Sequence, residues 1–114
     1  MNKDEFKEKL EEIRLSYIST MDSRREEIER YWSDLQTQWN LETFQQLYMI
    51  IHGIAGSAET FGFPEMTRQA RSITNQFKLI KQTGPNEHTL SELDPKVGLL
   101  IEMMELAVKN QDID

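Results

Sequence analysis

Apolar residues recur at helical spacing through most of the chain. In the first third they repeat as one face of an α-helix does, at Phe6, Leu10, Ile13, Tyr17, Met21, Ile28, Trp32, Leu35 and Trp39. Neither proline nor glycine occurs before Gly53. The pattern therefore predicts a first helix over about residues 4–38, which is long for a globular domain. If this helix breaks, we expect the break near Met21–Ser23.

Two further helices follow from start and stop residues. Asn40 is a candidate N-cap for a second helix over about residues 41–61. Gly62 is expected to end that helix in the left-handed conformation, which glycine adopts without steric cost. Pro64 then fits the first turn of a third helix, because its missing N–H has no partner there anyway. The third helix is expected to end near Gln82.

The stretch TGPNEHTLSELD, residues 83–94, contains two helix breakers and several polar turn formers, so it predicts a loop. Asp94 as N-cap and Pro95 in the first turn are expected to open a fourth helix. No segment shows period-two alternation. The sequence therefore predicts an all-α fold: a single domain over residues 1–114, built as an antiparallel up-down-up-down four-helix bundle with a long N-terminal helix.

Composition narrows the class of protein. The 114 residues carry a net charge of −7, and the 13 Lys and Arg are interleaved with the 20 Asp and Glu. A nucleic acid is therefore a poor partner. The absence of cysteine excludes disulfides, thiolate zinc sites and cysteine nucleophiles. No apolar stretch is long enough for a signal peptide core or a membrane span, so we expect a cytoplasmic protein.

The segment HGIAGSAETFG, residues 52–62, places a histidine away from the apolar side of the second helix. At about 100° per residue, His52 lies almost opposite the centre of the stripe formed by Leu47, Ile50, Ile51, Ile54, Ala58 and Phe61. His52 is therefore expected to face solvent. Gly56 follows one turn later on the same side, although a glycine inside a helix costs about 0.5–1 kcal/mol relative to alanine. We interpret this glycine as clearing space beside the imidazole.

Several kinds of chemistry lack the residues they need. The second histidine, His88, falls in the predicted loop, and no histidine or carboxylate stands one turn from His52 to share a metal. No serine is placed as in a nucleophilic triad, and no loop has the lysine that cradles phosphates. An exposed imidazole by itself remains a good nucleophile toward an activated phosphoryl group. The competing interpretation is an ordinary surface histidine.

Residues 52–63, HGIAGSAETFGF, resemble the signature of histidine-containing phosphotransfer (HPt) domains, H-x-[LI]-[KA]-G-[SA]-[SA]-x-x-x-G. The matching positions are His52, Ile54, Gly56, Ser57, Ala58 and Gly62. The continuation FGFPEMTRQAR looks like the branch of the family in which alanine, here Ala55, replaces the motif lysine. The resemblance is sharp over about residues 47–73 and elsewhere rests on the helical pattern alone.

The resemblance implies that His52 carries a phosphoryl group on the ring nitrogen farther from the backbone. The implied partners are response-regulator receiver domains and hybrid histidine kinases. A receiver's aspartate and bound Mg²⁺ would perform the transfer, so the chain would be a phosphoryl carrier, not an enzyme, with no cofactor or metal of its own. Gly56 would make room for the partner, and Gly62 would close the turn. Because the chain starts with Met1 and contains no other domain, we expect a free-standing protein. We also expect a monomer.

Two positions depart from the usual pattern of the family. Ala55 cannot neutralise a phosphoryl charge as a lysine would, and Glu59 places a carboxylate on the His52 face, where it would repel a phosphoryl dianion. The third helix is expected to lie level with His52, where it can supply substitute hydrogen-bond donors and positive charge. The candidates are Arg68, Arg71, Gln69 and Gln76. The alternative is that these side chains are ordinary solvated surface.

A partly apolar docking patch is expected around His52. Its predicted members are Gln45, Tyr48, Met49 and Ile51, with Ala55 beside them. The missing motif lysine and the Glu59 carboxylate leave a second interpretation open, in which the domain binds receivers or other signalling partners without being phosphorylated. A purely structural bundle must treat the whole 52–62 match as accidental and ranks last.

Overall fold

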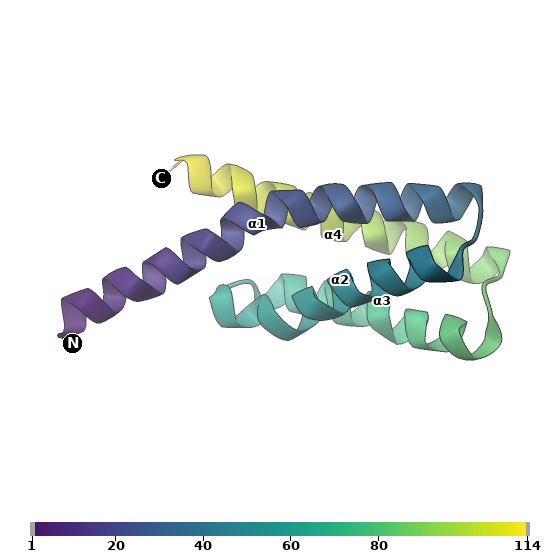
Figure 1. Cartoon of the computed structure of the whole chain (residues 1–114), viewed down its shortest axis with the longest axis horizontal. Helices are drawn as coiled ribbons and strands as arrows, with labels where there is room; N and C mark the ends of the chain where they lie inside the picture. The colour runs from purple at the N-terminus through teal and green to yellow at the C-terminus, as the bar shows by residue number, and fades with distance from the viewer. Residues whose placement is uncertain (1, 114) are drawn as a thin grey trace.

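A computed structural model describes the backbone of residues 2–113 and the side chains of residues 2–110. The elements are α1 (Lys3–Thr37), α2 (Leu41–Ser57), the 3₁₀ turn η1 (Glu59–Phe61), α3 (Pro64–Thr83) and α4 (Glu87–Ile113). Figure 1 shows α1 beside α4, with α2 and α3 forming a hairpin against them. The predicted all-α four-helix bundle with a long N-terminal helix is confirmed. None of the described helices is both long and apolar enough to cross a membrane.

Asparagine begins three of the helices. The side chains of Asn2, Asn40 and Asn86 accept hydrogen bonds of 2.9–3.0 Å from backbone N–H groups in the first turn of the helix that each one caps. These bonds satisfy donors that have no partner within the helix. Only the Asn40 cap was predicted from the sequence.

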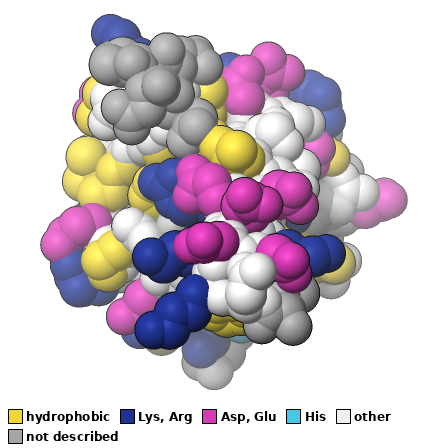
Figure 2. All heavy atoms as spheres, turned by 90° about the vertical axis from the view of Figure 1, so that its left-hand side faces the viewer, with side chains coloured by type: hydrophobic (Ala, Val, Ile, Leu, Met, Phe, Trp, Pro, Cys, Tyr) yellow, Lys and Arg dark blue, Asp and Glu magenta, His cyan; other side chains and the backbone are white. Residues whose placement is uncertain are grey.

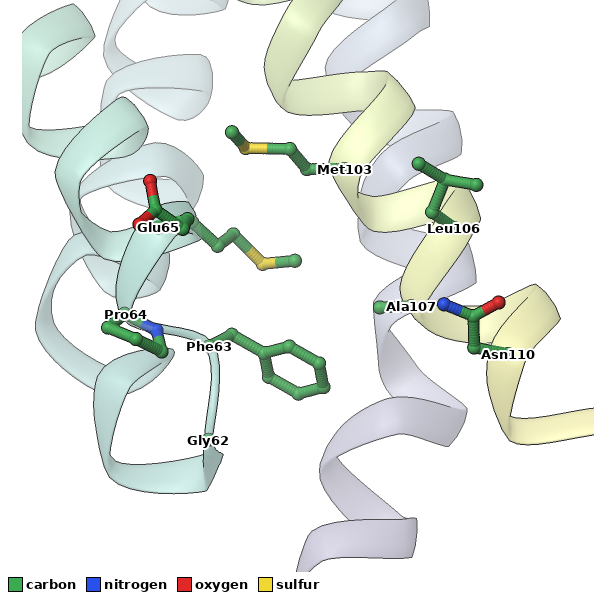
Figure 3. A pocket seen from close by; sticks show the side chains of 9 residues that line it. Gly62, Phe63, Pro64, Glu65, Met103, Leu106, Ala107 and Asn110 are labelled. Carbon is green, nitrogen blue, oxygen red and sulfur yellow. The ribbon is translucent and has the colours of Figure 1, made fainter. Parts of the chain in front are cut away.

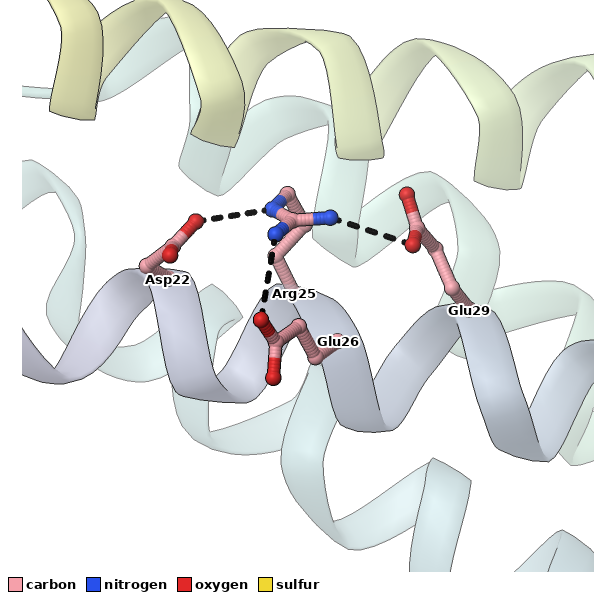
Figure 4. Close-up of polar contacts among 4 residues, drawn as sticks. All are labelled: Asp22, Arg25, Glu26 and Glu29. Carbon is pink, nitrogen blue, oxygen red and sulfur yellow. Dashed lines mark hydrogen bonds and ion pairs between the residues drawn. The ribbon is translucent and has the colours of Figure 1, made fainter.

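The helix α1 runs without interruption through Met21–Ser23, where a break was considered. Arg25 bridges this region (Figure 4): its Nε lies 2.9 Å from Asp22, its Nη1 3.0 Å from Glu29 and its Nη2 3.6 Å from Glu26. The hydrogen bond to the Asp22 carboxylate, more than the one to Glu29, raises the pKa of Arg25 above its ordinary value. Such pairs one turn apart each stabilise a helix by about 0.2–0.5 kcal/mol.

The turn between α2 and α3 forms largely as the sequence predicts. Gly62 adopts φ +96°, in the left-handed region, and Pro64 is the first residue of α3. The second helix ends earlier than predicted, at Ser57 instead of residue 61, because the chain tightens into η1. The Thr67 hydroxyl accepts a 2.8 Å hydrogen bond from the Glu59 N–H and so fixes η1 on the start of α3. At its other end α3 stops at Thr83, one residue beyond the prediction.

The predicted loop over residues 83–94 is wrong for most of its length. The helix α4 begins at Glu87 and passes through Pro95. Leu90, Leu93 and Val97 continue one apolar face across the proline, and Leu93 and Val97 are fully buried. This packing outweighs the cost of proline within a helix.

Asp94 does not cap a helix as the sequence suggested. Its carboxylate accepts hydrogen bonds from two side chains of α1, Trp32 Nε1 at 2.8 Å and Gln36 Nε2 at 2.9 Å. The contact joins α1 to α4 through a buried indole, whose N–H needs an acceptor. The acidic residue before the proline thus holds two helices together.

The core lies between the four helices and ends before α1 does. Its fully buried side chains include Phe44, Leu47, Ile51, Ile54, Ile73, Phe77, Leu93, Val97, Leu100 and Met104. The first turns of α1 run on past the turn between α2 and α3 (Figure 1). The first three members of the predicted α1 stripe, Phe6, Leu10 and Ile13, are therefore exposed.

Candidate functional site

His52 is exposed on α2, as its spacing predicts. Gln45, Met49 and Gly56 are exposed around it on the same helix. Tyr48, one turn before His52, is partly buried, and its ring centroid lies 6.2 Å from that of the imidazole. The surface next to the imidazole therefore combines an aromatic edge with a flexible apolar side chain.

The buried face of α2 is turned farther toward His52 than the sequence suggested. Ala55 is only 8% exposed, and Ile51 is fully buried. Phe44, which extends this face, packs edge-on against Phe77 of α3 at 5.2 Å between ring centroids. His52 thus lies at the border of the buried face and not opposite its centre. The expectation that Ile51 and Ala55 contribute to an exposed docking patch is wrong.

The packing of the chain itself does not require the two glycines near His52. Gly53 and Gly56 lie within α2, and neither has a positive φ. A Cβ added at either position would meet no atom within 4 Å. Because helical glycine is destabilising, both residues cost stability without relieving an internal clash. The open space lies outside the chain, where a second molecule can approach the imidazole.

A stripe of α3 faces α2 along the side where His52 lies. Its first member, Thr67, bonds the Glu59 N–H, and its last, Lys81, places its ammonium 5.7 Å from the Tyr48 ring centroid. Residues at this helical spacing share one face. The stripe consists of Thr67, Arg71, Thr74, Lys78 and Lys81.

The contacts between α2 and α3 fix which part of the stripe is level with His52. The rings of Tyr48 and Phe77 are 5.8 Å apart, and Glu59 meets Thr67. Since the helices are antiparallel, His52 is level with about Thr74, with Arg71 and Lys78 about one turn to either side. Arg71 and Lys78 are exposed. Sequence reasoning missed Lys78 and Lys81, although the spacing from Thr67 would have revealed them.

Comparison with known proteins gives a match over nearly the whole chain. The family model described as the Hpt domain matches residues 4–110. The chain belongs to the Hpt domain family. No curated protein and no solved structure matches it significantly. Hpt domains are phosphocarrier modules, not catalysts, and they act with response-regulator and kinase partners in two-component signalling.

Two residues expected beside the histidine of this Hpt domain point elsewhere. Gln69 donates a 2.9 Å hydrogen bond to the Lys96 carbonyl oxygen, and Gln76 donates one of 3.1 Å to Glu92. Both acceptors belong to α4, on the other side of α3. The expectation that these glutamines meet a phosphoryl group on His52 is wrong, because α4 supplies their partners.

Two charged residues named from the sequence lie at the end of the Hpt domain where α2 gives way to α3. Arg68 is exposed and paired with Glu65 in the first turn of α3. Glu59 is exposed in η1, directly after Ala58, whose backbone keeps helical angles.

The Hpt domain also has a small apolar cavity between the α2–α3 turn and α4 (Figure 3). It measures about 280 Å³, and Phe63, Met66, Met103 and Leu106 line it. His52 does not border this cavity. Within the described part of the chain, no group of three or more His, Cys, Asp or Glu side chains is placed to hold a metal.

Proposed function

We propose that this Hpt domain is a phosphorelay intermediate that accepts a phosphoryl group on His52 and exchanges it with receiver-domain aspartates. The observation that carries the proposal is an exposed imidazole on α2 with open space over Gly56, inside a chain that the family model matches over residues 4–110. We further propose that the domain acts in the cytoplasm as a monomer, in the branch of the family with Ala55 at the motif lysine position.

The proposed step is an in-line phosphoryl transfer. The lone pair of the His52 ring nitrogen farther from the backbone forms the N–P bond. The P–O bond to the receiver aspartate breaks, and its electron pair leaves with the carboxylate. The receiver supplies the Mg²⁺ that neutralises charge on the phosphoryl oxygens. The reverse reaction returns the phosphoryl group to an aspartate, because an N–P bond remains reactive.

Arg71 and Lys78 take over the electrostatic role of the missing motif lysine in this proposal. Both are exposed on the α3 stripe that faces α2, about one turn from the level of His52. Changing both to alanine is expected to slow phosphorylation of His52 about tenfold, because the phosphoryl dianion loses nearby positive charge. Initial rates with one phosphorylated receiver measure the effect.

A matched control removes two exposed cations elsewhere. Arg24 on α1 and Lys109 on α4 are both exposed, so their double alanine variant changes the net charge equally. Its rate should match that of the wild type. Equal slowing in the two double variants would show that only the overall charge matters.

Gly56→Ala is expected to stabilise the fold and impair transfer at the same time. The added methyl has open space within the chain and raises helix propensity, by about 0.5–1 kcal/mol. It also occupies the approach to His52, so the transfer rate should fall. Urea unfolding and the transfer assay measure the two effects.

Gly53→Ala is the control for this variant, because Gly53 lies in the same helix and also has open space around it. Gly53 is turned about 100° away from His52 around the helix, whereas Gly56 follows one turn later on the same side. It should give a similar gain in stability with a smaller loss of transfer. Full transfer by Gly56→Ala would contradict the proposed role of the glycine.

The function is tested by incubating the wild-type protein with a panel of receiver domains that acetyl phosphate has phosphorylated in the presence of Mg²⁺. The expected product is a phosphoprotein whose label is lost in acid and kept in base, as a phosphohistidine requires. Binding to a receiver without any label would instead favour a docking module, for which Ala55 and Glu59 are the supporting features of the sequence. If no receiver labels the protein and none binds to it, both functions are overturned.

A further inference from the structure

The N-terminal part of α1 presents a core-like face that the described structure leaves about half exposed. Phe6, Leu10 and Ile13 are 50–56% exposed. They lie on the face of α1 that farther along contributes Met21 and Ile28 to the core. The helix thus keeps its core-facing pattern past the point where the bundle ends.

Tyr17 marks the end of the bundle on this face. Its ring stacks on Phe61 at 4.3 Å between centroids, and its hydroxyl lies 2.9 Å from the Ser57 Oγ. On the N-terminal side of Tyr17, a groove of about 680 Å³ separates α1 from the α2–α3 turn, with Leu10 and Ile13 among its lining residues. The exposed face therefore has a wall along one side.

The exposed apolar face is a narrow stripe, wide enough to contact one partner helix. From Phe6 to Tyr17 the apolar residues follow steps of four, three and four residues, the spacing of a two-stranded coiled-coil seam. A helix that lies on a membrane has a broader apolar face. We call Phe6, Leu10, Ile13 and Tyr17 the N-terminal seam.

Basic residues flank the N-terminal seam on both sides. Lys7 and Arg14 lie along one edge, and Lys9 lies along the other. Asp4, Glu5, Glu8 and Glu12 lie away from the seam on the outer part of the helix. Glu11 borders the groove and pairs with Arg14 at 3.8 Å, so Lys7 and Lys9 are the cations that the seam offers a partner. Figure 2, which looks at this end of the molecule, shows apolar surface broken by dark blue and magenta side chains.

These flanking charges select among possible partners. A second copy that paired seam to seam would bring the lysines and arginine of one helix against those of the other. An anionic membrane would meet a protein of net charge −7 whose first helix carries five acidic side chains before Arg14. A single helix whose apolar stripe is flanked by acidic residues brings opposite charges against the basic edges of the seam, and it avoids the like-charge contacts of a second copy.

We propose that the N-terminal seam is a second interaction surface, which binds an amphipathic helix of another protein whose apolar stripe is flanked by Asp and Glu. The partner's apolar side chains pack between Phe6, Leu10 and Ile13, and its carboxylates pair with Lys7 and Lys9. The surface does not include His52, and its occupation needs no phosphoryl transfer.

The probe is a pair of synthetic peptides of three heptads, both with leucine at positions a and d. One has glutamate at positions e and g, and the other has lysine. Fluorescence anisotropy with the whole protein should show that the acidic peptide binds about tenfold tighter than the basic one. The double variant Lys7→Glu, Lys9→Glu should reverse this preference.

Leu10→Ser should abolish binding of the acidic peptide. Leu15→Ser is the matched control, because Leu15 is also partly exposed but lies on the opposite face of α1. Circular dichroism shows whether each variant remains folded. Equal affinity for the two peptides, or no binding to either, would overturn the proposal.

Two further measurements test whether a second copy of the chain or a membrane covers the N-terminal seam instead. A wild-type dimer in light scattering that becomes monomeric with Leu10→Ser would assign the seam to a second copy. Co-sedimentation with phosphatidylserine vesicles that Leu10→Ser removes would assign it to a membrane. Either result would overturn the proposed partner.

Discussion

His52→Gln is expected to abolish phosphoryl labelling of the protein while leaving its affinity for a receiver domain nearly unchanged. Glutamine keeps the size and polarity of the side chain but has no nucleophilic nitrogen. Because His52 is exposed and no core contact depends on it, the fold should not change. Labelling by a phosphorylated receiver, together with calorimetric titration against the unphosphorylated receiver, measures the two quantities.

His88→Gln is the matched control, since His88 is the second histidine and is also exposed. It lies in the first turn of α4, where it pairs with Glu92 at 2.7 Å. This variant should be labelled as the wild type is. Label retained by His52→Gln and lost by His88→Gln would transfer the phosphoacceptor role to α4.

Phe77→Ala is expected to destabilise the domain by about 3–5 kcal/mol, which is a large share of the 5–15 kcal/mol typical of whole domains. The Phe77 ring is fully buried and contacts Phe44 at 5.2 Å and Tyr48 at 5.8 Å between centroids. Its removal leaves a cavity beneath the surface that carries His52. Urea unfolding followed by circular dichroism measures the loss.

Leu79→Ala on the same helix is the control for this loss. Leu79 is 58% exposed, so its truncation should change stability by no more than about 0.5 kcal/mol. If Phe77→Ala also cost so little, the aromatic contacts between α2 and α3 would not hold the site in place. Other contacts would then have to fix the alignment of α2 and α3 that places His52 level with Thr74.

The elements that were predicted correctly have strong local determinants. The structure confirms the Asn40 cap, the left-handed conformation of Gly62 and the start of α3 at Pro64, although Gly62 ends η1 and not α2. The start of α4 was missed because Pro95 and the polar residues before it suggest a loop when considered locally. Packing of Leu93 and Val97 in the core, together with the Asn86 cap, decides the outcome instead.

The candidate site was predicted in part for a similar reason. Helical period alone placed His52 in solvent, and this exposure is confirmed, while its role stays a prediction. The burial of Ala55 depends on how α3 packs against α2, which a single helix does not encode, whereas Ile51 already belonged to the predicted apolar stripe and is buried with it. The partners of Gln69 and Gln76 likewise depend on α4, whose start was misplaced.

Because α1 projects beyond the bundle, its two parts differ in local stability. Before Tyr17 the backbone amides are held by helical hydrogen bonds alone, and isolated helices of about 12–15 residues are marginal in water. After Tyr17 the same helix is held by the core, so opening its amides requires breaking tertiary contacts. Amide hydrogen exchange should therefore change sharply within α1, and a bound partner helix would slow exchange only before that boundary.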